Sequence, residues 1–381
     1  MSAQQQDFRI IIIGAGPGGM CTAIKLREAP AKEPQAAVAP SGAVHVAYGV
    51  GDDLFCVSST DGGIRFGPPV RVGHGGVLSL GMRRGPRIGA TEKAVVIAAI
   101  AGKEGKGKDG DVLVWRSTNA GASWSGPIRV SDVVDSAREG LHGLAAGPEG
   151  ELFCVWNDNR TPGRMAVFGS VSHDGGATWG PSVKVYQAPE GPICPCCHPS
   201  AAIAPDGSIL VMWRNALQGQ RDMFTARSTD GGKTFGEAEK RGRGTWRLDA
   251  CPMDGGSIAV SADGRVETFW MREFSVFRQA GQEVEERLGP GTQVWGASGP
   301  NGRYVAWLVG RPGRLLVRSP GDEAPRPVAE RANDPMIASA ADGLGPTFLV
   351  WEDPDTGHIR AMPLARRSPG PVNARQKSKA Q

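Results

Sequence analysis

Ser172-His-Asp174-Gly-Gly176-Ala-Thr-Trp179 is one of four nearly identical eight-residue stretches in this chain of 381 residues. The other copies begin at Ser59, Ser117 and Ser228, so successive copies start 58, 55 and 56 residues apart. A fixed period of this size indicates one supersecondary unit that is stacked many times. The sequence therefore predicts a repeat architecture before any chemistry is considered.

Each copy contains the residue types of a tight turn. The acidic or amide side chain can bond the turn's own N–H groups, glycine accepts a positive φ, and the aromatic residue can pack the turn onto its neighbour. The residues expected to build the four turns are Ser59, Asp61, Gly63 and Phe66; Ser117, Asn119, Gly121 and Trp124; Ser172, Asp174, Gly176 and Trp179; and Ser228, Asp230, Gly232 and Phe235.

The pattern Ser-x-Asp-x-Gly-x-Thr-Trp resembles the Asp-box of the BNR, or sialidase-like, β-propellers. The copies at 172 and 228 match it best, whereas Asn119 replaces the aspartate and Arg65 replaces the threonine in the other two. The resemblance covers residues 34–365 and implies an all-β propeller of four-stranded blades. A hairpin pattern that ends in an aromatic residue recurs between the boxes. It predicts seven blades, with six, the number in sialidases, as the alternative.

The first residues look different. A predicted strand runs into Gly14-Ala-Gly16-Pro-Gly-Gly19, and residues 20–28 suggest a helix. This resembles the opening βα turn of a flavin-binding Rossmann domain, as in flavin-dependent monooxygenases. Pro30 breaks the helix and no second strand with a terminal acid follows, so FAD binding is not expected. Residues 1–33 are interpreted as a truncated βα fragment and linker, whose residues 8–13 could close the last blade, and residues 366–381 as a disordered basic tail.

The composition of the chain argues against several classes of protein. The 55 glycines and 29 prolines suit short strands joined by turns. The net charge of +4 is mild and the basic residues are scattered, so no nucleic-acid partner is expected. No run of 18 apolar residues predicts a membrane span. The chain as written shows no signal-peptide pattern and is predicted to be a cytoplasmic monomer, although the family resemblance also allows export.

The propeller topology sorts the loops. The boxes lie in turns between the third and fourth strands (C–D) of a blade, so the connections between the second and third strands (B–C) and between blades (D–A) lie at the opposite end. The candidate catalytic acids in those loops are Glu139, Asp249 and Asp254. The candidate substrate-binding residues are Arg138, His142, Arg214, Arg221, Asp222 and Trp246.

These residues point to a carbohydrate or another small acidic ligand, because guanidinium groups bind carboxylates and paired carboxylates suit acid–base work on a glycosidic bond. The hypothesis is a sialidase-like glycoside hydrolase for acidic sugars. Retaining sialidases use a tyrosine supported by a glutamate, and the three tyrosines here lie in predicted strands without such a partner. A non-catalytic binding or scaffold propeller is the alternative, and a flavin-dependent oxidoreductase is a remote one.

Cys194-Pro-Cys196-Cys197-His198 is the remaining unusual motif. It contains the spacing of c-type haem attachment, but haem also needs an export route and room for the macrocycle. Cys194, Cys196, Cys197 and His198, with Cys251 from the next loop, could instead supply soft ligands for zinc or copper. A disulfide between the loops is an equal alternative, because spacing cannot rank the two.

Overall fold

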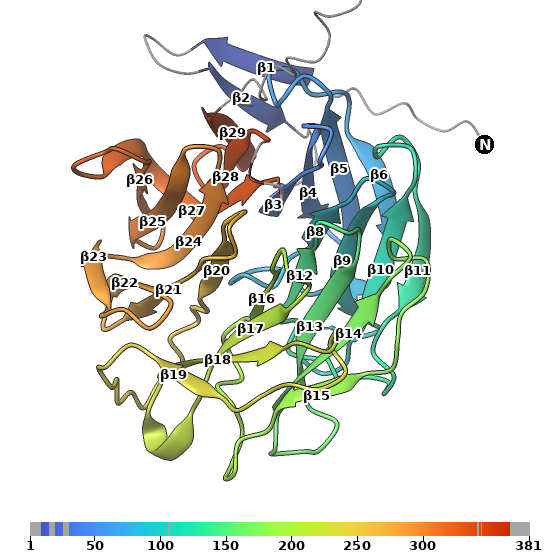
Figure 1. Ribbon diagram of the computed structural model, residues 1–381. Helices are drawn as coiled ribbons and strands as arrows, with labels where there is room; N and C mark the ends of the chain where they lie inside the picture. The colour runs from blue at the N-terminus through green and yellow to red at the C-terminus, as the bar shows by residue number, and fades with distance from the viewer. Residues whose placement is uncertain are drawn as a thin grey trace, which may run out of the picture.

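The computed structural model describes residues 9–14, 20–25, 30–105, 107–340, 343 and 345–365. Strands dominate this part of the chain, whose one helical element is a 3-10 turn, η1 (Leu217–Gly219). The small sheets stand around a common axis, and the chain passes from one to the next around the ring (Figure 1). The all-β propeller expected from the repeats is confirmed.

The first three blades follow one another along the chain. The first contains β3 (Lys32–Val38), β4 (Val44–Val50), β5 (Asp53–Ser59) and β6 (Val70–His74). The second contains β7 (Val77–Leu78), β8 (Arg87–Ala90), β9 (Val95–Gly102), β10 (Asp111–Ser117) and β11 (Ser125–Arg129). The third contains β12 (His142–Ala146), β13 (Leu152–Asp158), β14 (Ala166–Ser172) and β15 (Val183–Tyr186).

The other half of the ring repeats the pattern. The fourth blade contains β16 (Ser200–Ile203), β17 (Ile209–Arg214), β18 (Met223–Ser228) and β19 (Glu239–Arg241). The fifth contains β20 (Ser257–Val260), β21 (Val266–Arg272), β22 (Ser275–Ala280) and β23 (Glu286–Pro290). Then follow β24 (Thr292–Gly299), β25 (Gly302–Gly310), β26 (Gly313–Arg318), β27 (Arg326–Ser339), β28 (Thr347–Asp353) and β29 (His358–Ala365).

The long strand β27 decides how the blades are counted. Its first half pairs with β26 and its second half pairs with β28, so two blades merge into one eight-stranded sheet. Counted as hydrogen-bonded sheets, the described residues form six, which is the alternative count. The strand of each blade that lies nearest the axis is called here its inner strand. Each inner strand contacts the next, and the last contacts the first, so the described residues form a ring of seven inner strands: β3, β8, β12, β16, β20, β24 and β27.

The cores lie between neighbouring blades. One cluster joins the first and last blades through Tyr48 and Phe348, and another joins the third and fourth through Phe153 and Trp213. The five most buried tryptophans (Trp115, Trp156, Trp213, Trp270 and Trp307) come from five consecutive blades. Because each apolar face is covered only by the adjacent blade, the ring must close to bury all of them.

The four repeated turns have one hydrogen-bond pattern. In the third copy the Ser172 hydroxyl donates to Asp174 at 2.9 Å and accepts from the Gly176 N–H at 2.8 Å, and Asp174 accepts from the Thr178 N–H at 2.9 Å. The other three copies repeat the two serine contacts at 2.7–2.9 Å. These contacts give the polar groups of each turn hydrogen-bond partners within the same turn.

The aromatic residue of each repeated turn packs against the preceding blade. Phe66 lies 5.8 Å from Phe348 of the last blade, and Phe235 lies 5.8 Å from Phe153 of the third, measured between ring centroids. Trp124 and Trp179 pack into the clusters that join their blades to the first and second blades. The turns therefore fasten neighbouring blades together.

The N-terminal segment differs from expectation. Residues 20–25, expected to be helical, form the strand β2 (Met20–Lys25), which pairs with β1 (Arg9–Gly14) and with β29. The helix prediction is wrong, because the segment meets the open edge of the last blade and completes its backbone ladder there. The strand that closes this blade is β2, and not residues 8–13 as expected. The predicted tail, residues 366–381, lies outside the described residues.

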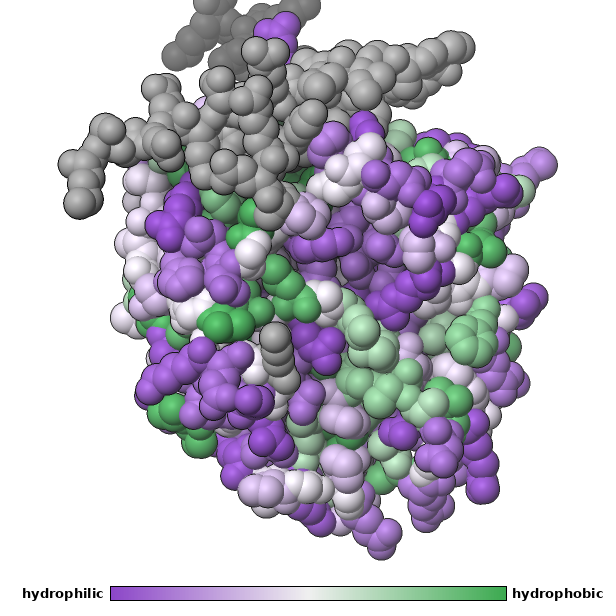
Figure 2. All heavy atoms as spheres, turned by 180° about the vertical axis from the view of Figure 1, so that it is seen from behind, coloured by the Kyte–Doolittle hydropathy of each residue, from purple (hydrophilic) through white to green (hydrophobic). Residues whose placement is uncertain are grey.

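The molecular surface is mixed in character. On the face seen in Figure 2, hydrophilic and hydrophobic side chains are interspersed. The exposed large apolar side chains of the described residues, such as Met82, Val134 and Phe274, come from separate loops. Within the described ranges no helix has the length and apolar character needed to cross a membrane.

Candidate functional site

Polar residues stand at or shortly before the start of the inner strands, and in β27 at the point where its pairing with β28 begins, at the end of the ring opposite the repeated turns. Each is buried although it is charged or polar, which is rare unless the group is paired or functional. Together with the adjoining Arg83 and Glu352 they are called here the axial cluster: Glu33, Arg83, Arg87, His142, His198, Asp254, Gln293, Asp334 and Glu352.

The backbone is distorted where these side chains originate. Glu33, Gln293 and Asp334 have φ values of 54°, 53° and 47°. The register of the first strand pair of each of their blades shifts at these positions. A bulge of this kind re-aims a side chain, and left-handed backbone at a non-glycine residue is costly. Three blades thus carry the same local strain, which directs a polar side chain toward the axis.

Three carboxyl groups lie close together within the cluster. The Glu33 carboxylate accepts from the Arg84 N–H at 3.0 Å and from the Gly85 N–H, and Glu352 accepts from the Glu33 N–H at 2.5 Å. Burial, together with the negative charge of Asp334, raises the pKa of Glu33 to about 7. Burial and Asp334 also raise the pKa of Glu352. A carboxyl group with a pKa near neutrality can hold or release a proton at physiological pH.

Two buried guanidinium groups face these carboxyls. Arg83 donates to the carbonyl of Gln293 at 2.9 Å, and Arg87 donates to those of Gly85 at 3.0 Å and Arg83 at 2.5 Å. Burial lowers the pKa of Arg87 to about 10, partly offset by Glu33. The Nε atoms of both arginines have no hydrogen-bond partner.

The histidines and Asp254 complete the ring. Neither ring nitrogen of His198 makes a hydrogen bond, and its ring stacks on Trp295 at 6.1 Å. Burial and the positive charges of Arg83 and Arg87 hold the pKa of His198 well below its usual value. Asp254 accepts from Thr292 and from the Gln293 N–H, both at 2.6 Å, through Oδ2, whereas its Oδ1 is unpartnered. Such unsatisfied buried groups suggest that the cluster can hold a polar ligand or ordered water.

Two of the predicted catalytic and substrate-binding residues belong to the axial cluster, and so does His198, which was predicted as a metal ligand. The two are Asp254 and His142, whose Nε2 lies 3.1 Å from the Ala98 carbonyl. Arg214 adjoins the cluster, but its guanidinium already donates hydrogen bonds to three backbone carbonyls, those of Asp254, Arg221 and Met271, at 2.6–3.0 Å. Those contacts tie the loops of two blades together.

The other predicted residues lie outside the cluster. Asp222 accepts from the Trp246 N–H at 2.9 Å and pairs with Lys240 at 2.8 Å, while Arg221 donates to the Leu248 carbonyl at 3.2 Å. Asp249 is exposed. In the loop between β11 and β12, Glu139 is half-buried, and its backbone carbonyl accepts a hydrogen bond from Arg84 at 2.7 Å. Arg138 is half-buried and faces the Asn159 amide. These residues are therefore not gathered with Asp254.

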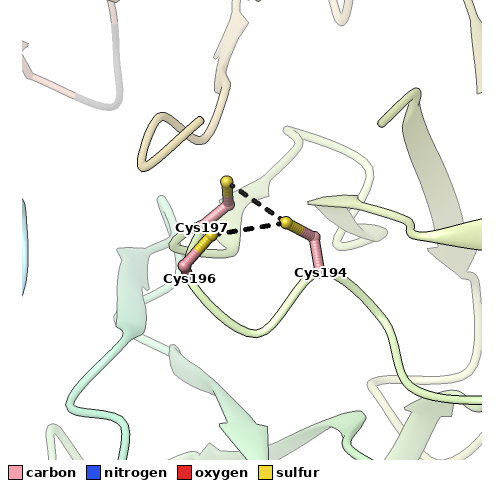
Figure 3. Close-up of side chains that lie close together, drawn as sticks. All are labelled: Cys194, Cys196 and Cys197. Carbon is pink, nitrogen blue, oxygen red and sulfur yellow. Dashed lines mark hydrogen bonds between the residues drawn. The ribbon is translucent and has the colours of Figure 1, made fainter. Parts of the chain in front are cut away.

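The cysteine motif forms a second site in the loop between β15 and β16. The thiols of Cys194, Cys196 and Cys197 are buried and point toward one another (Figure 3). Cys194 Sγ lies 3.6 Å from each of the other two sulfur atoms. The thiol of Cys251, predicted to join them, lies near that of Cys196 but outside the group of ligand atoms within 4.8 Å of one another. His198 is not part of the group of ligand atoms within 4.8 Å of one another, because its ring packs against Trp295 near the axis.

Sequence reasoning missed Glu33, Arg83, Arg87, Asp334 and Glu352. Glu33 lies at the end of the segment interpreted as a truncated fragment and linker, and Asp334 and Glu352 lie near the other end of the chain. The available signal was positional. Glu33, Arg83 and Arg87 precede or begin the first strand of a blade, Asp334 lies where β27 begins to pair with β28, and Glu352 follows the aromatic end of a second strand at Trp351. Loops at that end of a rigid ring are the usual place for function.

Comparison with known proteins supports the fold. Residues 88–265 match the model of the BNR repeat-like domain. A search of curated proteins finds no significant match. A protein of unknown function from Dyadobacter fermentans is 18% identical, with a TM-score of 0.52, over 89% of this chain and 96% of that one.

Two similar structures are sugar-acting enzymes. The Penicillium chrysogenum α-L-arabinanase, solved with arabinobiose, is 14% identical, with a TM-score of 0.52, over 88% of this chain and 93% of that one. An ulvan lyase of polysaccharide lyase family 25 is 12% identical, with a TM-score of 0.51, over 89% and 94% of the two chains. At these identities the likeness concerns the fold. The chain is thus a β-propeller, and its residues 88–265 match the model of the BNR repeat-like domain.

Proposed function

We propose that this chain is a sugar-acting β-propeller that binds an acidic carbohydrate at the axial cluster and cleaves it there. The observation that carries the proposal is the burial of two arginines, Arg83 and Arg87, close to Glu33, a carboxyl group whose pKa is about 7. The sugar-acting propellers with the same fold support the substrate class.

Each part of the cluster suits a role in this chemistry. The unpartnered Nε–H groups of Arg83 and Arg87 are donors for a sugar carboxylate. Glu33 is the proton donor, since its raised pKa keeps a share of it protonated near pH 7. Asp254, with its free Oδ1, is the partner carboxylate. Either hydrolysis or elimination can use such an acid–base pair.

Access to the cluster requires movement of the loop before β8. The N–H groups of Arg84 and Gly85 donate to Glu33, so this loop covers the proposed acid. Met82 on the same loop is 48% exposed, and both Met82 and Arg83 have positive φ, at 58° and 65°. A short strained loop of this kind is suited to opening for a ligand.

The test is turnover of a panel of uronic-acid and sialic-acid glycosides, with neutral arabinosides for comparison. Glu33→Gln is expected to abolish turnover while binding persists, and Arg87→Met to weaken binding of acidic sugars only. Glu92→Gln and Arg265→Met, both exposed at the opposite end, are the matched controls. Turnover that survives Glu33→Gln would show that Glu33 is not the acid.

A non-catalytic binding propeller is the second candidate. It is favoured by the burial of the cluster, because Glu33 and Asp254 are only 1% and 0% exposed. This candidate predicts saturable binding of an acidic sugar by calorimetry with no product from any glycoside. Binding and turnover are therefore measured on the same preparations.

A further inference from the structure

The three buried thiols form a preorganised group. Their ligand atoms all lie within 4.8 Å of one another, and two of the three sulfur–sulfur distances are 3.6 Å. Two thiolates bound to one zinc ion at about 2.3 Å and a tetrahedral angle are about 3.8 Å apart. The thiols therefore already stand at nearly the spacing that one metal ion imposes.

The surroundings hold these thiols in place. The Cys194 N–H donates to the Arg214 carbonyl at 3.0 Å, and the Cys197 carbonyl accepts from the Asn157 side chain at 3.0 Å. Ala216 and Met253 pack against this group of cysteines. Fixed backbone and an apolar shell are features of sites that exclude water from a bound ion.

The charge balance also suits a cation. Three thiolates and a divalent ion carry a net charge of −1, and the buried cationic residue Arg214 lies beside Cys194, whose N–H donates to the Arg214 carbonyl. A fourth thiol, that of Cys251 in the loop before β20, lies near Cys196 but outside the group of ligand atoms within 4.8 Å of one another, so it would join the ligands through a movement of its loop. That residue is exposed, so the metal could be reached from solvent.

We propose that Cys194, Cys196 and Cys197 bind a thiophilic metal ion, zinc(II) or copper(I), with Cys251 as the fourth ligand. Each thiol that binds gives its proton to solvent, and no oxidation is involved. The thiolate-only ligand set selects soft ions over magnesium or calcium. The bound ion would join the loop before β16 to the loop before β20, and so would fix His198 and Asp254 at the axis.

The first experiment titrates the reduced, metal-free full chain with cobalt(II) and zinc(II), and separately with copper(I), under anaerobic conditions. We expect one equivalent of cobalt to give sulfur-to-cobalt charge-transfer absorption that zinc abolishes. Competition between zinc and copper(I) against chelators of known affinity decides which ion is preferred. Circular dichroism confirms that each sample is folded.

The variants Cys194→Ser, Cys196→Ser and Cys197→Ser should each weaken binding at least tenfold, about 1.4 kcal/mol. Cys251→Ser should weaken it less and change the cobalt spectrum, because three thiolates remain. Cys56→Ala is the matched control, since Cys56 is buried in another blade interface. Its binding should equal that of the unaltered chain.

Alkylation of the unaltered chain keeps the proposal testable if a variant fails to fold. One equivalent of metal should protect Cys194, Cys196 and Cys197 from iodoacetamide, as read by peptide mass. Two results would overturn the proposal: no metal binding by the fully reduced chain, or binding that the three serine variants leave intact. Sugar turnover plays no part in either readout.

Discussion

The backbone N–H of Glu33 donates a hydrogen bond of 2.5 Å to the side chain of Glu352, although 319 positions separate the two residues. Lys32 adds an ion pair of 3.3 Å to the same carboxylate. Glu33 belongs to the inner strand of the first blade and Glu352 to the last blade. The Glu352 carboxylate therefore joins the first and last blades where the ring closes.

Replacement of Glu352 by alanine should therefore weaken the whole ring. The buried Glu33 N–H would lose its acceptor, which costs about 1–3 kcal/mol. Glu352→Gln keeps an acceptor oxygen and should cost less than the alanine variant. Urea unfolding of the three proteins measures the difference, and equal stability of all three would mean that this contact contributes nothing.

The raised pKa of Glu33 predicts a pH-dependent stability. Between its usual value of 4.5 and its folded value of about 7, the folded chain keeps a proton that the unfolded chain releases. Stability therefore falls as pH rises through this window, by about 1.4 kcal/mol per pH unit from this group. Glu33→Gln should remove on the order of 2–3 kcal/mol of that loss, whereas exposed Glu92→Gln should remove none. Unfolding midpoints at pH 5 and pH 8 provide the test.

His45 predicts the opposite dependence. Burial lowers the pKa of His45 to about 4 from its usual 6.5, so the unfolded chain binds a proton that the folded chain lacks between these values. The stability that comes from keeping His45 neutral is fully present above pH 6.5 and is lost as the pH falls toward 4. His45→Gln should reduce the loss between pH 6.5 and pH 5 by about 2 kcal/mol. His74→Gln, at an exposed site, is the control, and identical acid profiles for His45→Gln and the unaltered chain would refute this prediction.

The repeated turns predict a specific loss. Ser172→Ala removes the acceptor of the buried Gly176 N–H and should cost about 1–2 kcal/mol. Gly176→Ala should cost more, because φ is +84° there and a Cβ atom would lie 2.7 Å from Val96 of the preceding blade. His173→Ala is the control, since His173 is exposed in the same turn. Thermal unfolding that ranks the glycine variant above the His173 variant in stability would contradict the assignment.

The fold was predictable because its signals are local. Serine, an acidic or amide residue, glycine and an aromatic residue act within eight positions, and their period reports the blades directly. The error at residues 20–25 has a physical cause. A Gly-rich stretch before an apolar segment favours a helix, but the free edge of β29 offers backbone partners that local propensity cannot anticipate.

The candidate site was less predictable because it depends on the ring as a whole. Asp254 and His142 were found from their loops, but Glu33 and Glu352 meet only when the first and last blades close. Arg214 illustrates the converse. Its residue type suggested a ligand contact, and its three backbone acceptors are visible only in the folded loops.

The shared strand β27 has a consequence for how the ring comes apart. Among the described residues no strand is shared across the other seams, whereas β24–β26 and β28–β29 are joined through β27, which pairs with both. A fluctuation that frees one of these two blades must break the ladder of the other. Amide hydrogens of β25 and β28 should therefore exchange in a single cooperative unit, while earlier blades open separately.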